Sequence, residues 1–278
     1  MKAIVLTGAT SGIGLEIARE LLKQGHRVIS GARNMQKAKF VKSELIEDTK
    51  NDKIEFFETD FASFASVKQF AESIKNKYDA IDILINNAGT WEMKFQETFN
   101  GIETNLQVNH LSPMFLTLEL IPLVKKSMHA RIINTSSGAH RRDILNLDDL
   151  EFRKTAYDGV ASYSQSKLLN ILFSLELSER LGNTNITVNT VHPGYVKTSL
   201  FDKMGIRNWD GVPDAKLGAK SALFAALSPE IVGFSKRYFY LDKEDSNLSL
   251  MAQDKKLASQ IWAISIPYFK DFVDDINI

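Results

Sequence analysis

Short runs of aliphatic and β-branched residues alternate along this sequence with stretches whose apolar residues recur at helical spacing. Seven of the short runs have the length and composition of strands. Parallel strands need a long crossover between them, usually a helix, so this alternation is typical of a parallel sheet covered on both faces. The pattern predicts an α/β fold in three layers, α/β/α, built on a doubly wound seven-stranded parallel sheet.

The predicted strands cover residues 3–6, 27–30, 54–59, 83–86, 131–135, 187–191 and 237–241. The predicted helices cover residues 14–24, 35–47, 65–77, 101–126, 161–181 and 214–227. No repeat or Pro/Gly-rich linker divides the chain, so we expect residues 1–278 to form one domain. Residues 138–160 and 195–213 read as irregular substrate loops. The C-terminal segment 245–278 contains a further helical stretch, and we expect it to pack on the flank of the domain rather than to act as a lid.

Composition excludes several classes of function. Lys plus Arg and Asp plus Glu number 34 each, so no net charge favours nucleic acid or an anionic membrane as a partner. Cysteine is absent, which removes disulfides and thiolate sites and agrees with a reducing, cytoplasmic location. The apolar runs are too short for a signal peptide or an integral membrane segment. A small molecule is therefore the expected partner.

A glycine-rich turn, Thr7-Gly-Ala-Thr-Ser-Gly-Ile-Gly14, joins the first strand to the first helix. Glycines in such a turn let the backbone approach a pyrophosphate, which then lies at the positive N-terminus of the helix. The turn predicts a dinucleotide site in a Rossmann-type fold. Its expected contacts are Gly8, Thr10, Ser11, Gly12, Ile13 and Gly14.

The end of the second strand indicates which dinucleotide binds. An NAD enzyme usually has Asp or Glu there, against the ribose hydroxyls. This sequence has Ser30-Gly-Ala-Arg33-Asn34, with no acid, and the guanidinium of Arg33 can hold a 2′-phosphate and stack beside adenine. We therefore expect NADP(H) in preference to NAD(H).

The ordered set of motifs resembles the short-chain dehydrogenase/reductase family over nearly the whole chain. The set is the glycine-rich turn, Asn86-Asn-Ala-Gly89, Ser137, Tyr163-x-x-x-Lys167 and Pro193-Gly194. Details such as Val108-Asn-His110 and Tyr163-Ser-Gln-Ser-Lys-Leu-Leu-Asn170 are most similar to its retinol dehydrogenase and WW-domain oxidoreductase branch. The resemblance implies an oxidoreductase acting on CH–OH groups by hydride transfer, and a homodimer or tetramer formed through the helices near 105–126 and 161–181.

Tyr163 and Lys167 lie four residues apart, hence on one face of a helix. Of the seven tyrosines, only Tyr163 has a lysine at that distance. An ammonium beside the phenol favours phenolate, and lowering its pKa from about 10 to about 7 requires about 4 kcal/mol. Tyr163 is thus the expected general acid in carbonyl reduction and the general base in alcohol oxidation.

The resemblance implies further site residues. Ser137 would hydrogen-bond the substrate oxygen, in preference to its neighbour Ser136, and Asn109 in the fourth helix would hold a water linked to Lys167. The remaining cofactor contacts that it implies are Asp60, Phe61, Asn87, Ala88, Gly89, Tyr163, Lys167, Pro193, Gly194, Val196 and Thr198.

The segments that follow these motifs supply Trp91, His140 and Tyr195 as candidate lining of an apolar pocket for a hydrophobic aldehyde, ketone or alcohol. No metal site is expected from five scattered histidines without cysteine, and no G-x-S-x-G elbow supports a hydrolase. Membrane-bound retinol dehydrogenases carry an apolar anchor before the first strand, whereas this sequence starts at the strand, which weakens the expectation of a retinoid substrate. Two alternatives stay open: a non-catalytic, dinucleotide-sensing interaction protein, and a retinoid or lipid dehydrogenase held at a membrane surface through its C-terminal segment.

Overall fold

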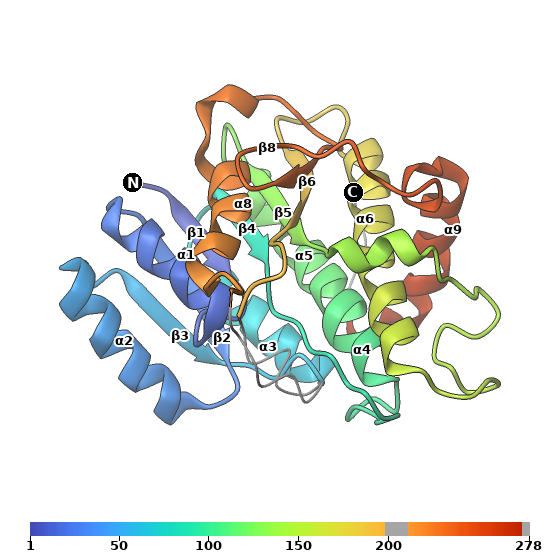
Figure 1. The fold of residues 1–278 in the computed structure, drawn as a ribbon. Helices are drawn as coiled ribbons and strands as arrows, with labels where there is room; N and C mark the ends of the chain where they lie inside the picture. The colour runs from blue at the N-terminus through green and yellow to red at the C-terminus, as the bar shows by residue number, and fades with distance from the viewer. Residues whose placement is uncertain (198–210, 274–278) are drawn as a thin grey trace.

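The computed structural model describes residues 1–197 and 211–273, and its centre is one eight-stranded sheet (Figure 1). Its order is β3-β2-β1-β4-β5-β6-β7-β8. The strands are β1 (Ala3–Leu6), β2 (Arg27–Ala32), β3 (Ile54–Glu58), β4 (Ile83–Asn86), β5 (Arg131–Thr135), β6 (Thr187–His192), β7 (Tyr238–Tyr240) and β8 (Lys243–Glu244). Strand order reverses between β1 and β4, where open α/β sheets bind their ligands.

The seven predicted strands are all present and parallel, and an eighth follows them. β8 pairs antiparallel with β7, through a tight turn in which Leu241 has a positive φ of 56°. Glycine or asparagine normally occupies such a position, so the sequence carries no hairpin signal here. β2 also runs two residues further than predicted, because Gly31 and Ala32 pair with Phe57 and Glu58 of β3.

Helices cover both faces of the sheet (Figure 1). They are α1 (Gly12–Lys23), α2 (Met35–Thr49), α3 (Phe64–Lys75), α4 (Thr104–Leu106), α5 (Ser112–Val124), α6 (Gly159–Arg180), α8 (Ala215–Leu227) and α9 (Lys255–Ser265). Ser63 caps α3 by accepting a hydrogen bond from the Ser66 N–H, and Asp214 caps α8 in the same manner from the Lys216 N–H. These caps explain why both helices begin within one residue of the predicted start.

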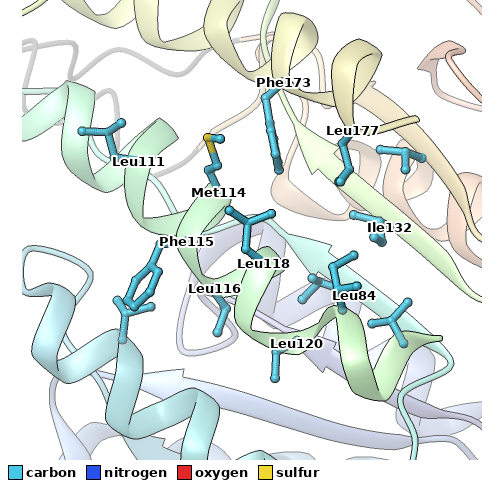
Figure 2. Packing of buried hydrophobic residues seen from close by; sticks show 14 of the residues in the cluster. Leu84, Leu111, Met114, Phe115, Leu116, Leu118, Leu120, Ile132, Phe173 and Leu177 are labelled. Carbon is cyan, nitrogen blue, oxygen red and sulfur yellow. The ribbon is translucent and has the colours of Figure 1, made fainter. Parts of the chain in front are cut away.

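Two hydrophobic clusters lie on opposite faces of the sheet, as the alternation of side chains along each strand requires. One packs α1, α2 and α8 against the sheet, and the other packs α3, α5, α6 and α9 against it. Figure 2 shows the second cluster, where Met114 and Leu118 of α5 gather with Leu84 of β4, Ile132 of β5 and Phe173 of α6. This packing fixes α6, which carries Tyr163 and Lys167, against the centre of the sheet.

The predicted fourth helix is not a single α-helix. Residues Gln107–Leu111 form a π-helical turn, η1, between α4 and α5. A π-turn inserts a residue into the helical repeat, and such turns occur frequently at functional sites. Asn109 lies within this turn, so the local backbone around it differs from the regular helix that the sequence predicted.

The segment 138–160, which was expected to be irregular, contains more structure than predicted. Residues Gly138–Arg142 form a 3-10 helix, η2, and α6 begins at Gly159 rather than at residue 161. In the C-terminal segment, α9 packs along α6, where Trp262 stacks on Phe173 with 6.0 Å between ring centroids. Part of the 195–213 segment, residues 198–210, lies outside the described residues.

Candidate active site

A cleft of about 430 Å³ opens at the carboxyl ends of the central strands, at the point where strand order reverses. It brings together most of the site residues predicted from the sequence. Those that line it are Gly8, Thr10, Ser11, Gly12, Ile13, Gly14, Arg33, Asp60, Phe61, Asn87, Ala88, Gly89, Tyr163, Lys167 and Pro193. Gly194 and Val196 are described but do not line the cleft, and Thr198 lies outside the described residues.

The glycine-rich turn has the geometry of a phosphate cradle. Gly8 and Gly12 have positive φ values of 80° and 54°, which other residues rarely adopt. A Cβ on Gly14 would collide with the Gly8 carbonyl oxygen, so this close turn needs glycine there. Ser11, the N-cap of α1, makes no side-chain capping bond, so its hydroxyl does not occupy the N–H groups of the first turn. A phosphate is the ligand that such a helix end favours.

The loop after β4 is tied to the loop after β1. The Thr7 hydroxyl oxygen accepts hydrogen bonds from the Asn87 and Ala88 N–H groups at 2.9 and 2.8 Å, and the Asn87 side-chain amide donates to the Thr7 carbonyl at 3.0 Å. Thr7 is fully buried. The two segments that form the floor of the cleft are therefore held together as one unit.

At one end of the cleft, Arg33 is exposed at its rim, directly after β2. The last residue of β2 is Ala32, so the position where an acid would meet ribose hydroxyls carries a methyl group. Asp60 also lines this end, and one of its carboxylate oxygens accepts a hydrogen bond from the Ala62 N–H at 2.9 Å.

At the other end, Tyr163 and Lys167 extend from the same face of α6, and both are about 95% buried. The Lys167 ammonium lies 5.4 Å from the centroid of the Tyr163 ring and 3.4 Å from the Thr135 carbonyl oxygen. A Cβ on Gly89 would come within 3.4 Å of the Lys167 nitrogen, so glycine leaves the space in front of the lysine open.

Burial is the main influence on the pKa values of the Tyr163 and Lys167 side chains. It raises the pKa of Tyr163 to about 12, against the lowering effect of a hydrogen bond with Ser137, and it lowers the pKa of Lys167 to about 8. We expected the ammonium to lower the phenol pKa toward 7. In this structure burial raises the pKa of Tyr163 instead, so Tyr163 is a neutral phenol at physiological pH.

The two serines after β5 point in different directions, as expected for neighbours on an extended chain. Ser136 is buried and donates its hydroxyl to the Lys167 carbonyl at 2.7 Å, on the backbone of α6. Ser137 is the one bonded to Tyr163, and its oxygen also accepts from the Ala139 N–H at 3.2 Å. Ser136 lines the cleft and Ser137 does not, but the Ser136 hydroxyl is engaged by the backbone of α6, whereas the Ser137 hydroxyl meets the Tyr163 phenol. The assignment of Ser137 as the donor to a substrate therefore stays a prediction.

Comparison with known proteins agrees with this geometry. The sequence profile of short chain dehydrogenases matches residues 2–208. The chain belongs to the short-chain dehydrogenase family. It is 35% identical to mouse retinol dehydrogenase 14 over 284 residues, which cover 95% of this chain and 84% of that protein. It is 34% identical to human polyprenol dehydrogenase over 278 residues, with coverage of 95% and 84%.

Among solved structures, an uncharacterised protein from Mycobacterium paratuberculosis matches this fold with a TM-score of 0.81 and 30% identity, covering 100% of this chain and 96% of that one. The predicted resemblance to retinol dehydrogenases is thus confirmed. As a short-chain dehydrogenase, the chain is an oxidoreductase that acts on alcohol and carbonyl groups by hydride transfer with a nicotinamide dinucleotide.

One residue of this short-chain dehydrogenase whose role the sequence did not reveal is His192, the last residue of β6. Its Nδ1 accepts hydrogen bonds from the N–H groups of Gly138 and Gly194, each at 3.2 Å. Its ring stacks on Tyr240, with 5.1 Å between centroids. Burial lowers the pKa of His192 to about 4, which keeps Nδ1 free to accept. The histidine therefore joins the turn after Ser137 to the Pro193-Gly194 loop.

The signal that could have found His192 is its place immediately before Pro193-Gly194 at the end of a central strand. From the sequence alone, the five scattered histidines predicted neither a metal site nor a role for this imidazole. Within residues 1–197 and 211–273, no three His, Asp or Glu side chains gather in a way that could hold a metal ion.

The three candidate pocket residues occupy very different environments. Trp91 is 8% exposed and lies against Tyr163, whereas Tyr195 is 50% exposed. His140 is fully buried and does not line the cleft. Its Nδ1 pairs with the Ser137 carbonyl at 2.7 Å, so it supports the serine turn from behind.

Asn109 lies beside the lysine, but its side chain is engaged elsewhere. Its Oδ1 accepts from the Thr90 N–H at 2.7 Å, and its Nδ2 donates to the Thr90 carbonyl and to the Ser166 hydroxyl, both at 2.9 Å. The amide thus fixes the chain after Gly89 rather than pointing freely at Lys167.

Among the described helices, none is both long and apolar enough to span a bilayer.

Proposed function

We propose that this chain is an NADP(H)-dependent oxidoreductase that interconverts a hydrophobic aldehyde or ketone and the corresponding alcohol, with Tyr163 as the general acid and base. The observation that carries the proposal is a single cleft that reaches from Arg33 to Tyr163 and Lys167. One end offers a cation suited to a 2′-phosphate, and the other offers a proton donor.

The residues of the cleft fit a dinucleotide. Gly8, Gly12 and Gly14 would receive the pyrophosphate at the N-terminus of α1, and Asp60 and Phe61 would flank the adenine. The peptide groups of Asn87–Gly89 would face the nicotinamide ribose, and those of Pro193, Gly194 and Val196 its carboxamide. When bound, the cofactor supplies the hydride through its nicotinamide C4.

The side chains of this chain manage the proton and the developing charge. In reduction, the Tyr163 hydroxyl gives its proton to the carbonyl oxygen, and a phenol whose pKa is raised to about 12 carries that proton at neutral pH. The Ser137 hydroxyl stabilises negative charge on the same oxygen, and the Lys167 ammonium stabilises the phenolate that forms. In oxidation the same groups act in reverse.

We infer that Asn109 serves a proton relay only indirectly. Because Thr90 and Ser166 occupy both polar atoms of its side chain, a water linked to Lys167 would bind the main-chain carbonyl of the π-turn instead. The π-turn interrupts the regular helical hydrogen bonds, so a main-chain carbonyl there can accept a bond from water, which supports this assignment.

The names of the relatives support a hydrophobic substrate, because retinol and polyprenol are both apolar alcohols. Two exposed apolar side chains next to segments that line the cleft, Met93 after Glu92 and Tyr195 after Pro193, agree with such a ligand.

We also infer that residues 1–278 form one domain, since both hydrophobic clusters share a single sheet.

The test uses purified protein with NADPH or NADH and a panel of aldehydes and ketones, followed by nicotinamide absorbance. We expect reduction with NADPH, and Tyr163→Phe should lower kcat/KM by about 10²- to 10⁴-fold while NADPH still binds. Binding of NADPH without any turnover would support the dinucleotide-sensing alternative instead, and a fully active Tyr163→Phe would refute the assigned proton donor.

A further inference from the structure

Trp91 lies face to face with the catalytic tyrosine. The indole and the Tyr163 phenol are 3.9 Å apart between centroids, and their planes differ by 4°. Both side chains are more than 90% buried. The indole therefore covers one face of the phenol, whereas the flanking residues Thr90 and Glu92 line the open cleft.

Two asparagines hold the backbone on either side of Trp91. The amide of Asn109 pairs with both the N–H and the carbonyl of Thr90. The amide of Asn105 pairs in the same way with Glu92, accepting from its N–H at 2.8 Å and donating to its carbonyl at 3.1 Å. Each asparagine is buried, so these paired hydrogen bonds are protected from water. Trp91 is fixed between two clamps.

The third attachment joins this segment to the start of α6. The indole N–H donates to the Gly159 carbonyl at 3.0 Å. A Cβ on Gly159 would come within 2.6 Å of both the Glu92 carbonyl oxygen and the Met93 Cα, so only glycine lets the segment lie this close to the helix. The position of the indole over Tyr163, one turn further along α6, is therefore built into the fold.

We propose that Trp91 is a specificity-determining residue: it forms a rigid wall over one face of Tyr163 and excludes carbonyl substrates that carry a bulky group on that side. The proposal rests on the proposed function. The carbonyl oxygen of a substrate must reach the phenol hydroxyl. The two substituents on the carbonyl carbon then have to fit into the space that the indole does not occupy. Substrates with one slender side, such as aldehydes and methyl ketones, fit that space, while ketones with two large substituents do not.

The same wall keeps water from the phenol. Desolvation is the main cause of the raised pKa of Tyr163, and the indole supplies the covering on one face. Removing the indole admits water to that face, which stabilises phenolate.

The experiment compares Trp91→Ala and Trp91→Phe with the parent on aldehydes, methyl ketones and ketones with two bulky groups. Trp262→Ala is the matched control, because it removes an indole that packs on Phe173 away from the cleft. Trp91→Ala should raise the kcat/KM ratio of bulky to slender substrates by about tenfold or more. Trp91→Phe keeps an aromatic ring on Tyr163 and should retain most of the parent's preference.

A second readout is the titration of Tyr163, followed by the ultraviolet absorbance of phenolate with Tyr163→Phe as the difference reference. Trp91→Ala should lower this pKa by about one unit, and Trp262→Ala should leave it unchanged. The inference is refuted if the parent reduces carbonyls but a folded Trp91→Ala keeps the same substrate ratio and the same Tyr163 pKa. A parent that reduces nothing on the panel would instead overturn the proposed function.

Discussion

Replacement of Arg33 by alanine tests the cofactor preference directly. Arg33 lies at the rim of the cleft, after a strand that ends in Ala32. Its positive charge can favour the 2′-phosphate of NADPH, whereas NADH has no charge at that place. The variant should therefore bind NADPH more weakly and leave NADH almost unaffected.

The magnitude follows from the exposure of the guanidinium. Two unit charges 4 Å apart in water interact by about 1 kcal/mol, and a phosphate with a charge near −2 doubles this to about 2 kcal/mol. Screening and side-chain entropy reduce the energy of an exposed ion pair. We therefore expect Arg33→Ala to weaken NADPH binding by about 1 to 2 kcal/mol. That range corresponds to a rise of about 5- to 30-fold in the NADPH KM.

The assay measures KM and kcat for NADPH and for NADH at low salt and again at high salt. The difference between parent and Arg33→Ala should shrink at high salt, because mobile ions screen an exposed pair. Ala32→Asp provides the complementary variant, since a carboxylate there should repel the 2′-phosphate and favour NADH. Equal losses for the two cofactors in Arg33→Ala would refute the reasoning.

Three further predictions concern charge, position and packing. Burial lowers the pKa of Lys167 from 10.5 to about 8, so the buried ammonium destabilises the fold fully below pH 8 and no longer does so above about pH 10.5. Lys167→Met should therefore raise the free energy of unfolding at pH 7 by up to about 3 kcal/mol while it abolishes activity. Denaturant titrations should show that this gain vanishes as the pH approaches about 10.5. His192→Phe keeps a ring against Tyr240 but loses the acceptor for two N–H groups, so kcat/KM should fall about tenfold and the free energy of unfolding by about 1 to 3 kcal/mol. His192→Asn, whose amide oxygen can accept, should recover part of both losses. Phe269 is fully buried between the rings of Phe64 and Phe115, and Phe269→Ala should cost about 3 to 5 kcal/mol of stability, which chemical denaturation would detect.

The same C-terminal packing bears on assembly. The family resemblance implied a dimer or tetramer formed through the helices near 105–126 and 161–181. In the described residues, α9 lies along α6 (Figure 1). The Phe269 ring packs on Phe115 of α5. We therefore expect light scattering to show a monomer, or an oligomer formed through another face. A dimer that is broken by exposed charges placed on α5 or α6 would contradict this.

Strand and helix positions were predictable because they depend on periodic apolar residues and local end signals. β1, β4 and β5 match their predicted bounds, since each is a buried central strand flanked by clear turn residues. β8 and the π-turn were missed for a shared reason. A two-residue strand with Leu241 in a positive-φ turn and a helix with one inserted residue both depend on tertiary packing rather than on a local pattern.

By itself, the sequence determined which chemical groups face the cleft, because the glycine turn, Arg33 and the Tyr163–Lys167 spacing are local features placed at the ends of predictable elements. Only the tertiary structure decided how those groups are tuned. The raised pKa of Tyr163, the stacked Trp91 and the bridge made by His192 all come from residues that are distant in the chain and meet after folding. Desolvation and stacking depend on what surrounds a side chain in space, and spacing along the chain does not encode that.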